Sequence, residues 1–267
     1  LNTAQSSAQP NWPQFRGDSA GVVVDDPSLP DTWGLQENVL WSIDVPGRSW
    51  SSPIIWDDHV FILSVVNIEN TETPLRPIED YRARSLGGAM TAADIVAATG
   101  TLRWLIYDVE LQTGKIRWER ILHEATPSEP THQKSSFAAE TPVTDGEHLY
   151  VYLGDIGLYA IDFDGGLRWS IPMEWLPRRN WGAAASPVVH DGRLYLVNDN
   201  ENQSYVAAYN TSTGEELWRT DREERSNWAT PFMWENEIRT ELVTSGTGGV
   251  RSYGLNGDLL WSLTGMS

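Results

Sequence analysis

Short apolar runs, separated by turn signals, recur along this chain of 267 residues at a nearly constant interval. One unit reads TPVT, HLYVYLG, LYAIDF and GLRWSI, and the next reads SPVVH, RLYLVND, YVAAYN and EELWRT. Such runs, rich in Val, Leu and Tyr, are typical of β-strands. The pattern therefore predicts four short strands in each unit.

A tryptophan ends the last run of each unit and sets the period. These closing tryptophans are Trp41, Trp118, Trp169, Trp218 and Trp261. The last three intervals are 51, 49 and 43 residues, and the longer first interval shortens once an insertion at residues 67–103 is removed. A Ser-Pro or Thr-Pro pair opens each unit, at Ser52, Thr141, Ser186 and Thr230. A period of this size indicates a stacked or circular repeat.

The turn residues and the two apolar faces of each strand favour one architecture. Asp-Gly pairs at 145–146 and 191–192 separate the first two runs of a unit, as expected for tight turns between antiparallel strands. Along HLYVYLG both alternating sets of side chains are apolar, so the sheet needs a neighbour on each side. A helical solenoid would need apolar residues every three or four positions, which the repeats lack. We therefore predict an all-β fold, a β-propeller of four-stranded antiparallel blades.

The units divide the chain into a lead-in segment and four blades. Residues 1–37 form an N-terminal tail and lead-in, and residues 38–45 resemble a fourth strand that lacks the first three of its unit. The blades are expected at about 51–120, 138–171, 183–220 and 227–263. Because the unit at 38–45 is incomplete, we expect about half of a larger propeller.

Composition and net charge limit the classes of partner that we expect. The net charge of −18 opposes binding to nucleic acid or to anionic membrane surfaces. There is no apolar stretch long enough for a transmembrane helix, and the absence of Cys excludes a disulfide framework. The Ser, Gln and Ala-rich start through Gln9 is typical either of the region after a cleaved export signal or of a fragment boundary. We expect an exported, periplasmic or extracellular protein.

The repeat unit, with its SP opening, LYAID, TGK and closing Trp, resembles the PQQ-like propeller repeat of quinoprotein dehydrogenases and of BamB. The segments NWPQFRG, GRSWSSPIIW, WGAAASPVVHDGRLYLVNDNENQSYVAAYNTSTGEELW and DREERSNWATP look like exported PQQ-like repeat proteins of planctomycete-type bacteria. The resemblance implies a propeller of about eight blades. For the enzymes it also implies adjacent cysteines, a bound calcium and a catalytic Asp, and this chain departs from that pattern because it has no Cys.

Unusual residues gather in the loops that enter each unit and in the loops between second and third strands. In an antiparallel blade both kinds of loop lie on one face, while the short turns QTGK, FDGG, STGE and LNGD lie on the other. A rim of cationic and aromatic residues on an acidic chain is a candidate binding surface for an anionic, sugar-like or peptide ligand. The candidate residues are Arg48, Trp50, His132, Lys134, Arg179, Trp181, Arg222 and Trp228. Alternatively, these tryptophans pack between blades and the arginines pair with carboxylates such as Glu223 and Glu224.

The insertion at 67–103 leaves from a second-to-third loop, so it is expected to overhang the same face. Thr91 is a candidate cap for a short helix that would include Ile95 and Val96. Long loops of this kind are often binding elements, although a family-specific decoration is the alternative.

Three motifs are better explained as structural. The GDSAG motif at 17–21 matches a nucleophile elbow but lacks the strand and helix that this motif needs. The DFDG motif at 162–165 lacks the later Glu of a calcium loop and coincides with a blade turn. The five histidines have no metal-ligand spacing. We predict no catalytic group and no metal site.

Two functions of different class follow. The first is a non-catalytic exported scaffold that binds a protein or glycan partner through its loop-rich face. The alternative is a PQQ-dependent dehydrogenase of alcohols or sugars, with PQQ and calcium as cofactors, which rests on the repeat resemblance alone.

Overall fold

Four antiparallel four-stranded sheets form the part of the chain that the computed structural model describes. The described residues are 11–18, 21–22, 27, 29–69, 95–96, 100–132, 134–174, 176–179 and 181–265. Within each sheet the strands follow one another in sequence order, and neighbouring strands are antiparallel. The predicted all-β class and the four strands per unit are confirmed.

The first two sheets are called blade 1 and blade 2. Blade 1 contains β1 (Ile54–Trp56), β2 (His59–Asn67), β4 (Leu102–Glu110) and β5 (Ile116–Ala125). Blade 2 contains β7 (Val143–Thr144), β8 (His148–Tyr152), β9 (Leu158–Asp162) and β10 (Leu167–Ile171).

The next two sheets are blade 3 and blade 4. Blade 3 contains β11 (Val188–His190), β12 (Arg193–Asn198), β13 (Ser204–Asn210) and β14 (Glu216–Arg222). Blade 4 contains β15 (Phe232–Glu235), β16 (Thr240–Ser245), β17 (Val250–Tyr253) and β18 (Leu259–Leu263).

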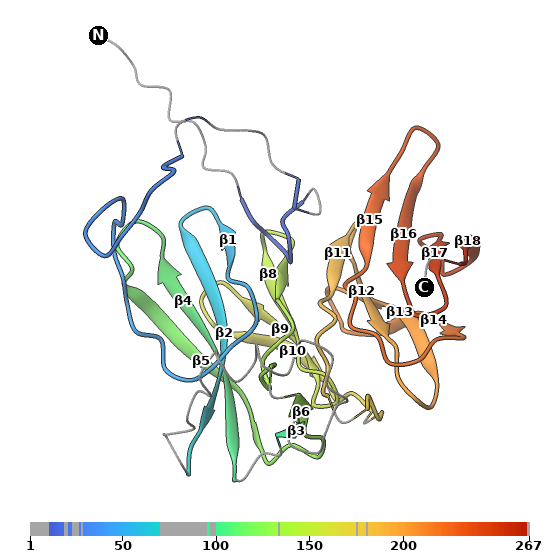
Figure 1. Cartoon of the computed structure of the whole chain (residues 1–267), viewed down its shortest axis with the longest axis horizontal. Helices are drawn as coiled ribbons and strands as arrows, with labels where there is room; N and C mark the ends of the chain where they lie inside the picture. Colours follow the sequence, from blue (N-terminus) through green and yellow to red (C-terminus); the bar gives the residue numbers. More distant parts are fainter. Residues whose placement is uncertain are drawn as a thin grey trace.

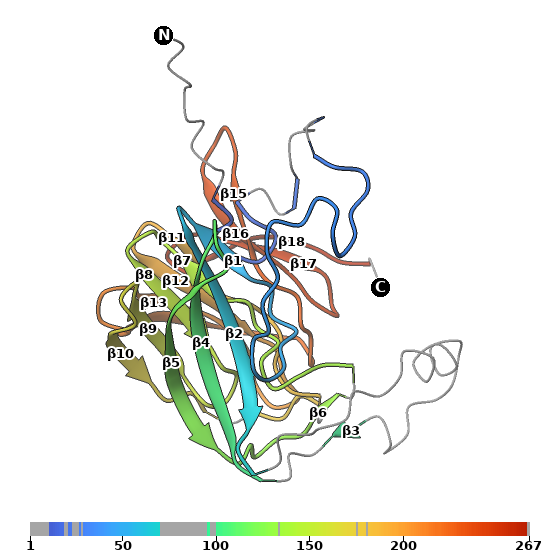
Figure 2. The same ribbon diagram turned by 90° about the vertical axis from the view of Figure 1, so that its left-hand side faces the viewer.

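The blades stand side by side in chain order, so that each packs one face on the next (Figures 1 and 2). Separate apolar clusters fill the spaces between blades 1 and 2, between 2 and 3, and between 3 and 4. Adjacent residues on β12 show why both faces are needed, because Leu194 and Tyr195 point to opposite sides and both are fully buried. The structure is therefore an incomplete β-propeller.

A repeated contact of the closing tryptophans fixes each blade to the next. Each indole Nε1–H donates to a backbone oxygen in the turn between the third and fourth strands of the following blade. The bonds run from Trp41 to Leu111 at 2.8 Å, from Trp118 to Phe163 at 2.8 Å, from Trp169 to Thr211 at 2.7 Å and from Trp218 to Leu255 at 2.9 Å. Trp261 differs, because its Nε1–H donates to Glu241 of the same blade at 2.7 Å.

The turn glycine is required at these contacts. Gly257 has a φ of +91°, and a Cβ built there would come within 2.7 Å of the Trp218 ring. Any other residue would therefore be strained and would push the indole away.

The Ser-Pro and Thr-Pro pairs link the inner strands in a similar row. The backbone N–H of Ser52 donates to Thr141 Oγ1 at 3.0 Å, that of Thr141 to Ser186 Oγ at 2.9 Å, and that of Ser186 to Thr230 Oγ1 at 3.1 Å. The sequence landmark thus corresponds to one hydrogen bond across each blade boundary.

The predicted strand at 38–45 lacks a β-ladder in the structure. The segment still covers the outer face of blade 1, where Trp41, Ile43 and Val45 pack against Val60 and Tyr107. It alternates half-buried and exposed residues like a strand, but no neighbouring strand in the described chain offers it backbone hydrogen bonds.

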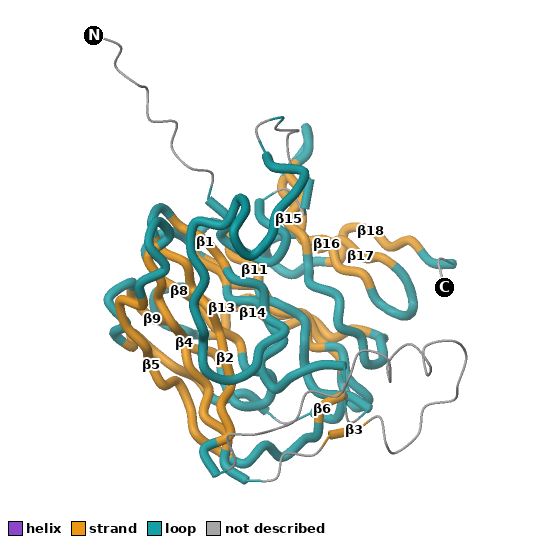
Figure 3. The backbone as a smooth tube through the Cα atoms, turned by 60° about the vertical axis from the view of Figure 1, so that its left-hand side comes forward, coloured by secondary structure: helices purple, strands orange, loops and turns teal. Residues whose placement is uncertain are grey.

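The described N-terminal residues and the strand pair at residues 95–96 and 131–132 lie at opposite ends of the blades (Figure 3). Trp12 exchanges two backbone hydrogen bonds with Ile55 of β1. From the insertion, β3 (Ile95–Val96) pairs with β6 (Thr131–His132).

The predicted helix is wrong at Ile95 and Val96, because β-branched residues beside an available strand gain ladder hydrogen bonds there. The rest of that segment, including Thr91, lies outside the described residues. No helix long and apolar enough to cross a membrane occurs among the residues that the structure describes.

Replacement of Trp218 by Ala is expected to lower the free energy of unfolding by about 3 kcal/mol, because it removes a half-buried indole and its hydrogen bond. Trp218→Phe should keep most of the packing and cost about 1 kcal/mol. Urea unfolding measures both. Trp33→Ala is the matched control, since that indole is 73% exposed, and an equal loss in the control would contradict the assignment.

Candidate functional site

The loops that enter each blade and the loops between second and third strands meet on one face, called the loop face. Ser128 of an entry loop donates to Asp155 of the β8–β9 loop at 2.8 Å, and Thr247 of the β16–β17 loop donates to Glu224 at 2.9 Å. The β3–β6 pair joins the insertion to the same face through Thr131 and His132. The sequence correctly placed these loops together.

An aromatic cluster forms from three of the predicted site residues. Trp181 stacks on Trp228, with ring centroids 4.9 Å apart and planes 21° apart, and the His132 ring lies edge-on to Trp181 at 5.3 Å. The Nε1–H of Trp228 donates to the Gly182 oxygen at 2.8 Å. The cluster therefore joins the entry loops of blades 2, 3 and 4. Trp50 is a separate indole, 62% exposed, on the entry loop of blade 1.

The cationic residues among the predicted site residues differ in exposure and in their hydrogen-bond partners. Arg48 is half-buried and its backbone pairs with Val65. Lys134 is exposed, and its backbone N–H donates to His132 Nδ1 at 3.0 Å. Arg179 is exposed, but its Nε donates to Glu201 Oε1 at 3.0 Å.

Arg222 is buried and does not reach the surface of the rim. Its Nε and Nη2 donate to the two carboxylate oxygens of Asp199 at 2.8 and 3.1 Å, and both side chains are fully buried. Nη1 is shared by Thr244 and Tyr253. Burial disfavours the charged guanidinium and would lower the pKa of Arg222. The hydrogen bonds with Asp199 outweigh this effect, so the pKa is raised. The alternative that arginines of these loops pair with carboxylates thus holds for Arg222, although its partner is Asp199 and Glu224 pairs with Arg251.

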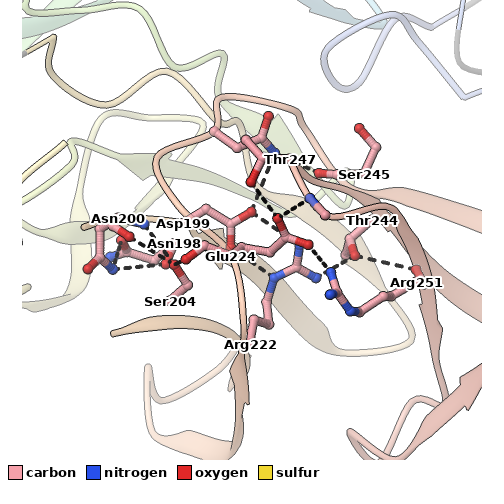
Figure 4. Close-up of polar contacts among 12 residues, drawn as sticks. Asn198, Asp199, Asn200, Ser204, Arg222, Glu224, Thr244, Ser245, Thr247 and Arg251 are labelled. Atoms are coloured by element: carbon pink, nitrogen blue, oxygen red, sulfur yellow. Dashed lines mark hydrogen bonds and ion pairs between the residues drawn. The ribbon is translucent and has the colours of Figure 1, made fainter. Parts of the chain in front are cut away.

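Glu224 forms a second paired site beside the first (Figure 4). Its carboxylate accepts hydrogen bonds from Thr247 Oγ1 at 2.9 Å, from the Gly248 N–H at 2.8 Å and from Arg251. Burial alone would raise its pKa, but these donors lower it. The carboxylates of Asp199 and Glu224 thus tie the end of β14 to the loops of blades 3 and 4.

Three carboxyl groups line a small cavity below the aromatic cluster. Glu129, Glu140 and Asp155 share this cavity of about 30 Å³ with Gly182 and Ala183. Glu129 accepts a hydrogen bond from the Arg178 backbone at 2.8 Å. Glu140 accepts from its own backbone N–H and from that of Ala139, the latter at 3.2 Å. Burial therefore raises the pKa of Glu140 to about 7.

These residues do not fit a calcium-bound PQQ. A cavity of about 30 Å³ holds water, whereas ligand pockets are usually about 300 Å³ or more. Within the described ranges, no three His, Asp or Glu side chains converge as metal ligands.

An open depression of about 510 Å³ lies at the boundary between blades 3 and 4. Its floor contains the buried pairs of Arg222 and Glu224. Its wall is formed by neutral polar groups and by charges of both signs: Asn202, Gln203, Ser204, Asp221, Glu223, Arg225, Thr247 and Gly248. The lining therefore offers both hydrogen-bond donors and acceptors, a composition suited to a polypeptide or polyhydroxylated surface.

Sequence analysis missed the acidic half of the site. Asp199, Glu140 and Glu129 are not among the residues that it singles out. The available signal was Arg222 itself, since an arginine in a packed boundary requires a carboxylate partner.

Breaking the buried pair should be costly. Arg222→Met or Asp199→Asn is expected to lower the free energy of unfolding by about 3–5 kcal/mol, because each leaves an unpaired buried charge. The double variant should lose less than the sum of the two, which urea unfolding in a double-mutant cycle measures. Strict additivity would show that the pair is not coupled.

Glu140 should make stability fall as pH rises. The pKa of Glu140 is 4.5 in the unfolded chain and about 7 in the folded chain. Ionisation of the buried carboxyl therefore does not lower the free energy of unfolding below pH 4.5, and lowers it by the full difference above pH 7. Glu140→Gln is therefore expected to stabilise the protein by up to about 3 kcal/mol at pH 8 and by little at pH 4. Urea unfolding at both pH values tests this, with exposed Glu147→Gln as control. An equal effect at both values would refute it.

Comparisons with solved structures give partial matches. The chain is 15% identical to a quinohemoprotein alcohol dehydrogenase from Pseudomonas putida HK5, with a TM-score of 0.43, over 64% of this chain and 33% of that one. The chain is 13% identical to the quinohemoprotein alcohol dehydrogenase from Comamonas testosteroni, with a TM-score of 0.45, over 64% of this chain and 34% of that one. It is 14% identical to BamB from Moraxella catarrhalis, with a TM-score of 0.32, over 64% of this chain and 63% of that one.

The chain thus spans about one third of the length of these two dehydrogenases. No curated protein matches the sequence. One family model matches residues 104–264, which include blades 2 to 4 and the last two strands of blade 1. Because this match covers more than half of the chain, the protein belongs to the family described as outer membrane protein assembly factor BamB.

Proposed function

We propose that this protein is a non-catalytic, exported scaffold that binds a protein partner through its loop face. The observation on which this rests is the depression between blades 3 and 4, whose wall offers hydrogen-bond donors, acceptors and charges of both signs. An extended polypeptide presents the complementary backbone groups at regular spacing.

The pairing of the loop-face cations favours a protein over a small anion. Arg222 and Arg251 are committed to Asp199 and Glu224, and Arg179 contacts Glu201. Arg225, in contrast, is exposed on the wall of the depression. Trp50 adds an exposed indole, the residue type most enriched in the energetic centres of protein interfaces. Membership in the family of an outer membrane assembly factor supports a protein partner and a periplasmic location.

The test is affinity capture of partners with the intact protein from an envelope extract, followed by identification and by direct titration of the captured protein. Trp50→Ala combined with Arg225→Ala is expected to weaken binding by about 1–3 kcal/mol, because both side chains are exposed on the loop face. Trp33→Ala combined with Arg168→Ala is the matched control, since both are exposed on other parts of the molecule.

Three outcomes would contradict the proposal. Unchanged affinity in the loop-face variant would remove this face from the interaction. Saturable binding to a glycan array without a protein partner would assign a glycan instead, and a spectral shift with PQQ and calcium, accompanied by dye reduction with alcohols or sugars, would support the dehydrogenase.

A further inference from the structure

A cavity of about 220 Å³ lies at the end of the blades opposite to the loop face. We call this end the turn face, because the short turns that follow β1, β7 and β11 lie there. Trp56 of β1, Asp145 of the turn after β7 and Asp191 of the turn after β11 line the cavity, and Asp18 of the N-terminal segment completes it. The cavity therefore lies among blades 1, 2 and 3, and none of the described residues of blade 4 lines it.

The N-terminal segment, residues 11–18, is held against two blades and forms one side of the cavity. The backbone N–H of Asp57 donates to Asn11 Oδ1 at 2.8 Å, and that of Thr144 donates to the Pro13 oxygen at 2.9 Å. The first bond fixes the segment to blade 1 and the second fixes it to blade 2. The NWPQFRG motif of the sequence thus has a structural role, which is to carry Asp18 to the cavity.

Three carboxylates from three separate segments line the cavity, and no Lys or Arg of the described chain does. The carboxylates of Asp18 and Asp191 form no hydrogen bond or ion pair with any described residue. Asp145 differs, because it accepts hydrogen bonds from Tyr150 Oη at 2.7 Å and from the His148 N–H at 2.8 Å. Partial burial raises the pKa of the Asp18 carboxyl, as expected where no cation offsets the desolvation. The cavity therefore has an excess of negative charge.

Size and lining indicate an organic cation and not a metal ion. Within the described ranges, no three His, Asp or Glu side chains converge as metal ligands. The cavity is several times larger than the roughly 30 Å³ of one water, yet smaller than the roughly 300 Å³ of pockets for drug-sized ligands. It thus has room for a group of side-chain size. Trp56 adds an aromatic ring, which attracts ammonium and guanidinium groups. His190 also lines the cavity, and its Nδ1 lies 3.9 Å from Glu235 Oε1.

We propose that this cavity binds an organic cation, an alkylammonium or guanidinium group carried by a basic side chain of a protein or by a free polyamine. The cationic group pairs with the carboxylates of Asp18 and Asp191, which have no other partner in the described chain. Trp56 provides the aromatic surface beside them. The site is at the opposite end of the blades from the loop face, so it does not depend on the function proposed for that face.

Isothermal titration of the intact 267-residue protein tests the proposal with three probes: spermidine, a blocked glycine peptide with one central lysine, and the same peptide with that lysine acetylated. Spermidine or the lysine peptide should bind saturably at one site. The acetylated peptide should not bind, because acetylation removes the charge. The probe that binds more tightly identifies the source of the cation, a free polyamine or a protein side chain.

Asp18→Asn and Asp191→Asn should each weaken this binding about three- to tenfold, because each removes one charged acceptor. Asn suits position 191, where φ is +47°, because Asn tolerates this backbone conformation nearly as well as Asp. Asp164→Asn is the matched control. Asp164 is exposed in the β9–β10 turn, it does not line the cavity, and its replacement changes the net charge by the same amount.

Four results would overturn the proposal. They are the absence of saturable binding by both spermidine and the lysine peptide, equal binding of the acetylated peptide, displacement of the bound probe by an equimolar amount of calcium, and equal weakening by Asp164→Asn. The last result would show that the overall charge of −18 attracts the cation without a site.

Discussion

The hydrogen bond from each closing indole to the next turn is the interaction on which the arrangement of the blades depends. Burial of apolar faces drives the sheets together but does not fix their angle, because the hydrophobic effect is non-directional. The indole N–H and the Ser-Pro or Thr-Pro row add two directional contacts, one near the outer strand and one near the inner strand. Together they determine how each sheet lies on its neighbour.

Trp261 also satisfies its indole N–H, but with an acceptor in its own blade. A partly buried indole N–H needs an acceptor, and among the described residues that of Trp261 finds the buried carboxylate of Glu241. The closing tryptophan is therefore satisfied in all five units, but only four of them gain a boundary from it.

Charge on the loop face is governed by burial. Asp199, Arg222 and Glu224 lie at the boundary between blades 3 and 4, where an unpaired charge would cost several kcal/mol. Their pairing ties the loops together, whereas Arg225 and Trp50 remain exposed. Of the cations predicted on this face, Arg222 is buried, whereas Lys134 and Arg179 are exposed.

The sequence alone determined the class of the fold, the number of strands per unit and the face on which the long loops gather. It could do so because these features depend on local periodicity, turn glycines and the parity of antiparallel connections. The closing tryptophans gave the period of the repeat, and the structure shows that four of them are contacts between segments of neighbouring units.

Tertiary structure decided which loop residues remain available. Arg222 and Arg225 look alike in the sequence. Arg222 is buried against Asp199, which comes from the β12–β13 loop, whereas Arg225 is exposed. The same holds for Ile95 and Val96, which become a strand only because Thr131 and His132 lie beside them. Such outcomes depend on partners distant in the sequence, and those partners are set by the packing of whole blades.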